Sequence, residues 1–274
     1  MTQRRRPIIV LIVGFALLGM PGAALGVAWP SVADDLGRAL GDLGILTLAT
    51  GVAYGAMSLV GGTLSKRFPA GKLLVAATFG GAIGLLGYAT GDSWWLLVMA
   101  SVPIGIAGGV LDSLGNSYVA LERGPREMGA IHASFGFGSM VAPLAMTTIL
   151  AAGLSWRVGF GVLVIAQIAL GVALAVVAPA IRMPMEGRPE RPERTGSRLL
   201  LGASIWTFFI YAGVEGSIGL WAFTLLTEGQ GVADGAAGVG VAAYWGALFV
   251  SRLLIGIAGD RVPMNVTIRL SVVG

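Results

Sequence analysis

The sequence predicts an all-α membrane protein with about eight transmembrane helices and the start of a ninth. Of its 274 residues, 55% are hydrophobic and only 12% are charged, whereas an ordinary soluble protein has about 25% charged residues. The mean hydropathy is +0.83, and the 44 glycines would let helices pack closely within a bilayer. Eight apolar runs are each long enough to cross the hydrocarbon core.

Six of these runs lie in residues 1–181, which we expect to form an N-terminal six-helix half. The first run follows Arg4, Arg5 and Arg6 and is too long for the apolar core of a cleaved signal peptide, so we predict a retained helix. Short loops containing charges, glycine or proline separate the runs. The six predicted helices span residues 7–33, 43–64, 73–90, 94–121, 128–152 and 156–180.

A change in composition follows the sixth run. Residues 182–198 read RMPMEGRPERPERTGSR, which is rich in proline, arginine and glutamate and predicts a flexible cytoplasmic linker. Residues 199–274 would then be the start of a C-terminal half, with helices at 199–227 and 235–259. A ninth helix would begin near Val266, but the nine residues up to Gly274 are too few to span a membrane.

The distribution of lysine and arginine predicts the orientation of these helices. With the N-terminus in the cytoplasm, fifteen basic residues fall in cytoplasmic segments and only Arg38 and Arg157 fall in outer loops. This positive-inside bias supports a bacterial-type cytoplasmic (inner) membrane protein whose N-terminus and central linker are cytoplasmic. The fifteen residues are Arg4, Arg5, Arg6, Lys66, Arg67, Lys72, Arg123, Arg126, Arg182, Arg188, Arg191, Arg194, Arg198, Arg261 and Arg269.

A short loop pattern occurs twice in the chain. It reads GTLSKRFP from Gly62 and GIAGDRVP from Gly256, 194 residues further on. Both copies lie at the inner end of the second helix of a predicted half. A repeat with the same membrane orientation, together with a central linker, is typical of a transporter built from two halves.

These loops resemble the signature loop of the major facilitator superfamily, whose pattern is roughly Gly-x-x-x-Asp-Arg-x-Gly-Arg-Lys. The first copy departs from it, because Lys66 replaces the usual Asp and Pro69 the usual Gly. The resemblance implies a cytoplasmic latch made by charge pairs between helices. The residues that match the motif are Gly62, Arg67 and Lys72 in the first copy and Gly256, Asp260 and Arg261 in the second.

A narrower resemblance is to the fucose-permease-like branch of that superfamily. It rests on three segments in order: Asp112, Ser113 and Asn116 in the fourth helix, His132, Phe135, Gly136 and Gly138 in the fifth, and Tyr211, Gly213 and Glu215 in the seventh. The resemblance implies a sugar permease. Because family members have twelve helices, it also implies that this chain is an N-terminal two-thirds fragment whose C-terminal helices are missing.

Asp112 and Asn116 are polar residues inside the apolar run that starts at Trp94. They are four residues apart and therefore share one face of a helix. A charged acid near the bilayer centre costs roughly 2.5–3.5 kcal/mol on insertion scales, so it usually faces a cavity, a partner or an ion pathway. We interpret Asp112 as a proton-coupling carboxylate; the alternative is an acid hydrogen-bonded to a neighbouring helix. Asn116 would either bind a solute hydroxyl or bond across helices.

The seventh and fifth helices carry the other candidates. Glu215 lies among glycines and is interpreted as a cavity acid or as the structural partner of a polar group in the fourth or fifth helix. Tyr211 and Trp221 are candidate solute contacts, although Trp221 could equally anchor its helix at the interface. His132 is a candidate gate residue, with a packing hydrogen bond as the alternative.

Several other residues stand out without receiving a site role. Arg252 is expected to snorkel or to join the loop latch with Asp260. Tyr54 and Gln167 are polar groups in apolar runs to which the sequence assigns no role. The tryptophans at outer helix ends are predicted to be interface anchors; they are Trp29, Trp94, Trp95 and Trp156.

These patterns together predict a secondary active transporter that works by alternating access. It would move a small polar, sugar-like solute with a proton or other coupling ion. The alternatives are proton-antiport efflux of drugs or metabolites, and a fragment that does not transport.

The sequence also argues against other classes of protein. There is no cysteine and only one histidine, so we expect neither a resident metal centre nor a cofactor. Although the pI is 9.8, the basic residues are spread over short loops, which argues against nucleic acid as a partner. An enzyme is not expected, because the nearest approach to a Gly-x-Ser-x-Gly elbow, around Ser217, has Glu215 in place of the first glycine.

Overall fold

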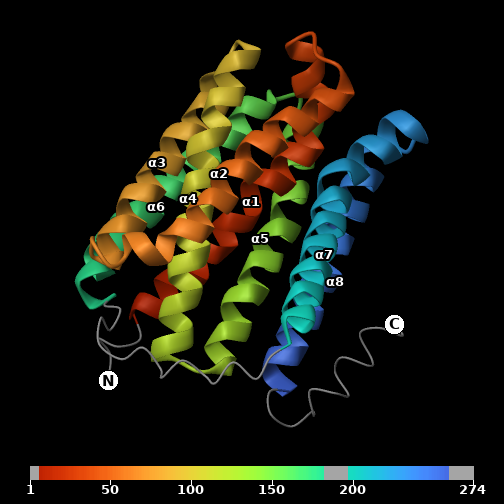
Figure 1. Cartoon of the computed structure of the whole chain (residues 1–274). Coiled ribbons are helices and arrows are strands. Elements are labelled where there is room, and N and C mark those ends of the chain that lie inside the picture. The colour runs from red at the N-terminus through yellow and green to blue at the C-terminus, as the bar shows by residue number, and fades with distance from the viewer. Residues whose placement is uncertain (1–5, 182–196, 259–274) are drawn as a thin grey trace.

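The computed structural model describes residues 6–181 and 197–258, and this part of the chain is helical almost throughout. No strand occurs in it, which confirms the predicted all-α fold. Its eight long helices are all long and apolar enough to cross a membrane. They are α1 (Arg6–Asp35), α2 (Leu43–Leu64), α3 (Ala70–Thr90), α4 (Trp94–Glu122), α5 (Pro125–Ala151), α6 (Trp156–Val177), α7 (Arg198–Thr224) and α8 (Asp234–Ala258) (Figure 1).

The helix boundaries agree with the sequence prediction most closely where a charged or polar segment flanks an apolar run. The bounds of α2 are those predicted. In contrast, α3 and α5 each begin three residues earlier than expected, so Lys72 and Glu127 lie in first helical turns instead of loops. Charged side chains are tolerated there because a helix end can project beyond the hydrocarbon core. The predicted ninth helix, Asp260 and Arg261 lie outside the described residues.

The ends of α6 and α7 change helix type. A 3-10 turn at Ala178–Ala180 follows α6, and a π-helical turn at Leu225–Gly229 follows α7. Both segments were predicted as continuous α-helix for most of their length, since apolar periodicity does not separate these helix types. The first turn of α7 begins at Arg198, the last residue of the predicted linker; residues 182–196 of that linker lie outside the described part of the chain.

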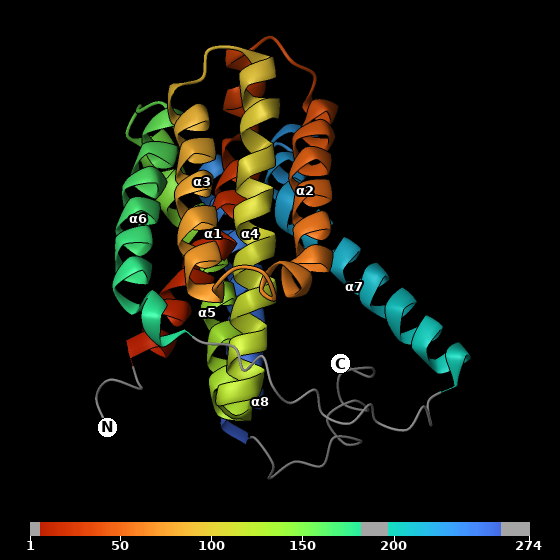
Figure 2. The same cartoon turned by 60° about the vertical axis from the view of Figure 1, so that its left-hand side comes forward.

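The helices form a bundle in which α4 stands between α2 and α3 (Figure 2). Behind them, α1 packs on α5 and α6, and α6 also packs on α3. Helix α8 packs along α5, and α7 contacts α1 and α8; the first turns of α7 diverge from the rest of the bundle (Figure 2). The most extensive helix contact is between α5 and α8, so the first six helices and the last two are joined mainly there, with a smaller contact between α1 and α7.

Glycines set the close approach of α2 to α4. A methyl group at Gly109 would lie 3.0 Å from Cβ of Met57, and one at Gly108 would lie 2.8 Å from Cδ2 of Tyr54. At the lower end of the crossing, Gly61 faces the hydroxyl of Ser113. Small residues at such positions let two helix backbones approach within a membrane, and they fix the register of α2 against α4.

We expect Gly109→Ala to destabilise the protein, because the added methyl has no space between α2 and α4. Overpacking of this kind costs about 1–3 kcal/mol, so the temperature of unfolding in detergent should fall. Gly55→Ala on α2 is the matched control, since nothing lies within 4 Å of the methyl it adds. Equal unfolding temperatures for the two variants would contradict the proposed packing.

Three of the four tryptophans predicted as interface anchors, Trp29, Trp94 and Trp156, are buried instead. Trp29 is 0% exposed and donates a hydrogen bond from Nε1 to the carbonyl oxygen of Leu40, at 2.7 Å. Trp156 is 1% exposed, and its Nε1 donates to a carboxylate oxygen of Asp35, at 2.9 Å. The anchor prediction was wrong for Trp29 and Trp156 because each indole finds a partner on an adjacent segment and can therefore be buried. It was also wrong for Trp94, which is 8% exposed and packs against the ring of Trp29. Trp95, 71% exposed, remains consistent with an anchor.

Candidate substrate and ion site

Asp112 projects from the middle of α4 toward polar groups of three helices. Asn116, one turn below it, donates a hydrogen bond from Nδ2 to Asp112 Oδ1 at 2.8 Å, as their spacing predicts. The hydroxyl of Tyr54 on α2 and the ring of His132 on α5 both lie close enough to interact with the carboxylate. In the described part of the chain, no lysine or arginine forms an ion pair with Asp112.

A cavity of 290 Å³ lies within the first six helices and adjoins this group through Tyr54. Tyr54 forms part of its wall, together with Thr50 of α2 and Gln167 of α6. Most of the other lining residues are apolar, including Leu111, the neighbour of Asp112. A mostly apolar cavity with a few polar groups is the usual form of a small-molecule site. A second space of 200 Å³ shares the Thr50 and Tyr54 wall and extends to Leu220 of α7.

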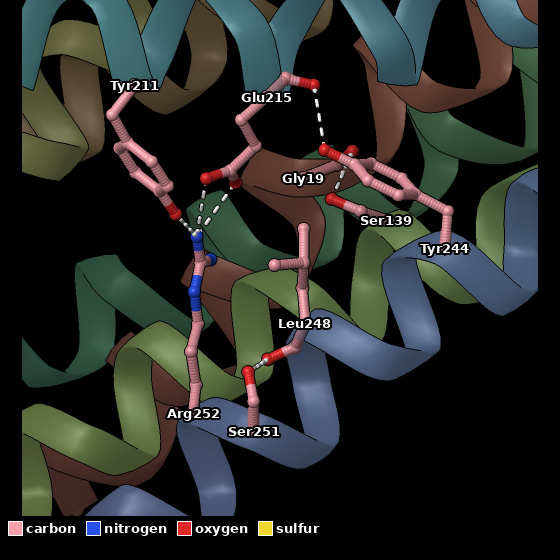
Figure 3. A network of polar contacts seen from close by, with 8 residues as sticks. All are labelled: Gly19, Ser139, Tyr211, Glu215, Tyr244, Leu248, Ser251 and Arg252. Carbon is pink, nitrogen blue, oxygen red and sulfur yellow. Dashed lines mark hydrogen bonds and ion pairs between the residues drawn. The ribbon is translucent and has the colours of Figure 1, made fainter. Parts of the chain in front are cut away.

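A second polar group lies between α7 and α8 and is centred on Arg252 (Figure 3). Its Nη2 donates to both carboxylate oxygens of Glu215, at 2.7 and 2.9 Å, and to the hydroxyl of Tyr211, at 3.0 Å. The side chains of Arg252 and Glu215 are 22% and 12% exposed. Arg252 therefore points inward and neutralises Glu215, and it does not snorkel toward the end of α8.

The same group has one further contact between α7 and α8 and one contact with α5. The hydroxyl of Tyr244 donates to the backbone carbonyl of Glu215, at 3.3 Å (Figure 3). The guanidinium of Arg252 lies 5.9 Å from the ring centroid of Phe135 on α5, and Phe135 in turn lines the 290 Å³ cavity. The partners of Glu215 thus come from α7 and α8, and its charge partner is not on the fourth or fifth helix.

His132 connects the two polar groups. Its ring is in electrostatic range of both Asp112 and Arg252, and it packs edge-on against Phe15 of α1 at 6.2 Å between ring centroids. The ring therefore lies where α1, α4, α5 and α8 approach one another. This position fits either a gate or a packing role for His132.

A larger cavity, of 620 Å³, opens where α1 and α5 end and α8 begins. Four carboxylates line it, and no lysine or arginine is among its lining residues. One of the four, Asp35, is paired with Arg157 at 2.7 Å. The acids are Asp34, Asp35, Glu228 and Asp234. Carboxylates lining a cavity favour cations and disfavour anions there.

The remaining predicted residues lie apart from these groups. Trp221 is half-buried against the hydrophobic core and lines none of the three cavities. Gly62 lies in the last turn of α2, and Arg67 and Lys72 are exposed nearby. Within the described ranges, neither of these two basic residues forms an ion pair, consistent with Lys66 occupying the acid position of the loop. Gly256 packs on Gly129 of α5.

Four residues that line the 290 Å³ cavity or belong to the polar groups were not predicted as site residues from the sequence: Thr50, Tyr54, Gln167 and Arg252. Their signal was present, since each is a polar or charged residue in an apolar run. Such residues usually face the interior of a helix bundle. Sequence alone does not show which of them meet, because that depends on the register between helices.

Comparison with known proteins identifies the family. The family model described as Major Facilitator Superfamily matches residues 11–274. The chain belongs to the major facilitator superfamily. It is therefore an integral membrane protein. Its superfamily consists of transporters that move small solutes across the lipid bilayer.

The curated relatives of this superfamily member are distant. It is 27% identical over 246 residues to a "Probable actinorhodin transporter" of Streptomyces coelicolor, covering 85% of this chain and 41% of that protein. It is 28% identical over 140 residues to "Sodium-dependent glucose transporter 1" of Danio rerio, covering 50% and 23%. It is also 28% identical over 157 residues to "Probable sulfoacetate transporter SauU" of Cupriavidus necator, covering 55% and 35%. The chain thus spans less than two thirds of the length of these relatives.

Proposed function

We propose that the protein is a secondary active transporter of the bacterial cytoplasmic membrane. It moves a small polar, sugar-like solute together with a cation bound at Asp112, by alternating access between two six-helix halves. The observation that carries this proposal is Asp112 itself, an interior carboxylate without a lysine or arginine ion-pair partner in the described structure, next to residues that line a 290 Å³ cavity.

Comparison of the two interior acids supports a cation at Asp112. Glu215 is held by Arg252 at 2.7 Å, so this pair carries no net charge. Asp112 has only neutral or weakly basic neighbours, namely Tyr54, Asn116 and His132. A membrane-embedded acid in this situation is costly unless a cation or a proton neutralises it. The sequence-based prediction names the proton, and that choice remains a prediction.

Two features support a neutral polar solute. The carboxylates lining the 620 Å³ cavity would repel an organic anion that passes through it, whereas they do not repel a sugar. Inside, the hydroxyls of Thr50 and Tyr54 and the amide of Gln167 offer hydrogen bonds without a full charge. The resemblance to sugar permeases and the named substrate of the glucose transporters point the same way.

Export by cation antiport is the second candidate function. It is kept as an alternative because the relative that aligns over 85% of this chain is named for actinorhodin and not for a sugar. The same acid and cavity would serve an antiporter, because the direction of net transport follows from the gradients and from the order of binding.

Transport by proteoliposomes containing the complete gene product tests the proposed function. We expect a neutral hexose or polyol to be accumulated when a cation gradient is imposed, and sulfoacetate to be excluded. An aromatic metabolite extruded against its gradient, without hexose uptake, would favour the exporter. Movement of none of these solutes, in a preparation shown to be folded and inserted, would contradict transport of a small polar solute.

The arrangement of the chain in the membrane belongs to the same proposal. We propose that residues 1–181 form the N-terminal half, that residues 182–198 link it to residues 199–274, and that further C-terminal helices complete the second half. The cytoplasmic placement of the N-terminus and linker follows from the distribution of basic residues.

A further inference from the structure

Two buried oxygen atoms without a hydrogen-bond partner lie at the crossing of α2 and α4. They are Oγ of Ser58 and Oδ1 of Asn116. An unsatisfied buried oxygen costs about 1–3 kcal/mol, so each such atom in a folded protein calls for an explanation. Asn116 already uses its amide nitrogen on Asp112, and its oxygen remains available to accept.

The register of the two helices brings these atoms to the level of Asp112. Helices α2 and α4 run in the same direction, with Met57 facing Gly109 and Gly61 facing Ser113. Ser58 follows Met57, and it lies one turn after Tyr54 on the face of α2 that packs against α4. Tyr54 itself interacts with the carboxylate of Asp112. Figure 2 shows the two helices side by side over this length.

The four side chains present oxygen atoms of three kinds: a carboxylate, an amide oxygen and two hydroxyls. Carboxylate, carbonyl and hydroxyl oxygens are ligands for hard cations. With one carboxylate among them, the group carries a single negative charge. No three His, Asp or Glu side chains in the described structure lie close enough together to hold a metal ion, which disfavours a divalent ion here and fits a monovalent one.

We propose that Asp112, Asn116, Ser58 and Tyr54 form a binding site for Na⁺. The ion would neutralise Asp112 and engage both unpaired oxygens, whereas a proton on Asp112 would neutralise the charge only. The coupling role of this site rests on the proposed function, but ion binding does not. Na⁺ and a proton would compete for the same carboxylate.

Thermal unfolding of the purified protein in detergent tests the site. Unfolding is compared in NaCl, KCl and choline chloride at one ionic strength and at alkaline pH, where few protons compete. A bound ion stabilises the folded state according to its concentration relative to Kd, so we expect a saturable rise in unfolding temperature with NaCl that exceeds the rise with the other two salts.

Variants assign the effect to the proposed ligands. Ser58→Ala and Asn116→Ala should each raise the Na⁺ concentration for half-maximal stabilisation by about tenfold or more. Ser117→Ala is the matched control on α4, because its exposed hydroxyl already donates to the carbonyl of Ser113 at 2.7 Å, and it should leave the Na⁺ response unchanged. If Asn116→Ala does not fold, the Na⁺ response of Ser58→Ala alone decides whether the ion binds at the proposed ligands.

Equal unfolding temperatures in NaCl and choline chloride would overturn the Na⁺ site. A Na⁺ response that Ser58→Ala and Asn116→Ala leave intact would also overturn it, since the ion would then bind elsewhere. Failure here is distinct from failure of the proposed function: a protein that does not respond to Na⁺ but accumulates solute on a pH gradient remains a proton-coupled transporter.

Discussion

Asp112→Asn should abolish ion-driven accumulation of solute and leave solute exchange across the membrane intact. Moving one positive charge through 100 mV is worth about 2.3 kcal/mol, which supports roughly 50-fold accumulation of a neutral solute. Without a carboxylate that takes up the cation, the ratio of internal to external solute should fall to about one. Counterflow, in which labelled solute exchanges with unlabelled solute, needs no coupling and should continue.

Two control variants accompany Asp112→Asn. Asp112→Glu keeps the charge and should retain part of the accumulation, whereas Asp92→Asn alters an exposed acid in the turn between α3 and α4 and should have no effect. If Asp112→Asn accumulates solute as the unaltered protein does, Asp112 does not carry the coupling cation.

Removing Arg252 alone should destabilise the protein far more than removing Arg252 and Glu215 together. In Arg252→Gln, the carboxylate of Glu215 stays between α7 and α8 without its guanidinium partner. Breaking a buried ion pair on one side costs about 3–5 kcal/mol, which corresponds to roughly 10 °C in unfolding temperature for a domain of this size. Replacing both residues by glutamine removes both charges and should restore most of the loss.

The matched control for this comparison is Arg38→Gln. Arg38 pairs with Asp42 one turn away at 2.8 Å, on a more exposed surface, and such pairs contribute about 1 kcal/mol or less. The unfolding temperatures of all the variants are measured in the same detergent. If Arg252→Gln and the double variant unfold at the same temperature, the pair does not stabilise the structure as its geometry implies.

Much of the fold could be predicted from the sequence because bilayer thickness restricts the answer. An apolar run bounded by charges must form a helix of about the required length, which is why α2 begins and ends where predicted. The starts of α3 and α5 were predicted three residues too late, because charged first turns carry no apolar signal. The buried positions of Trp29 and Trp156 depend on hydrogen bonds to Leu40 and Asp35, which are contacts between segments that sequence does not place.

Side-chain contacts of the candidate site could be predicted from the sequence where they lie within one helix, and could not where they join two helices. The bond from Asn116 to Asp112 follows from a spacing of four residues. The pairing of Glu215 with Arg252 joins residues 37 positions apart and depends on the packing of α7 against α8. The level of Ser58 relative to Asp112 likewise follows from glycines that set the register of α2 and α4.

The central claim is that Asp112 carries one coupling cation, and the current that accompanies solute transport tests it most directly. In proteoliposomes under an inward cation gradient, addition of a neutral solute should drive an inward current of one positive charge per solute molecule, and Asp112→Asn should show no current. A current of the same size in Asp112→Asn, or accumulation of neutral solute without any current, would contradict the claim.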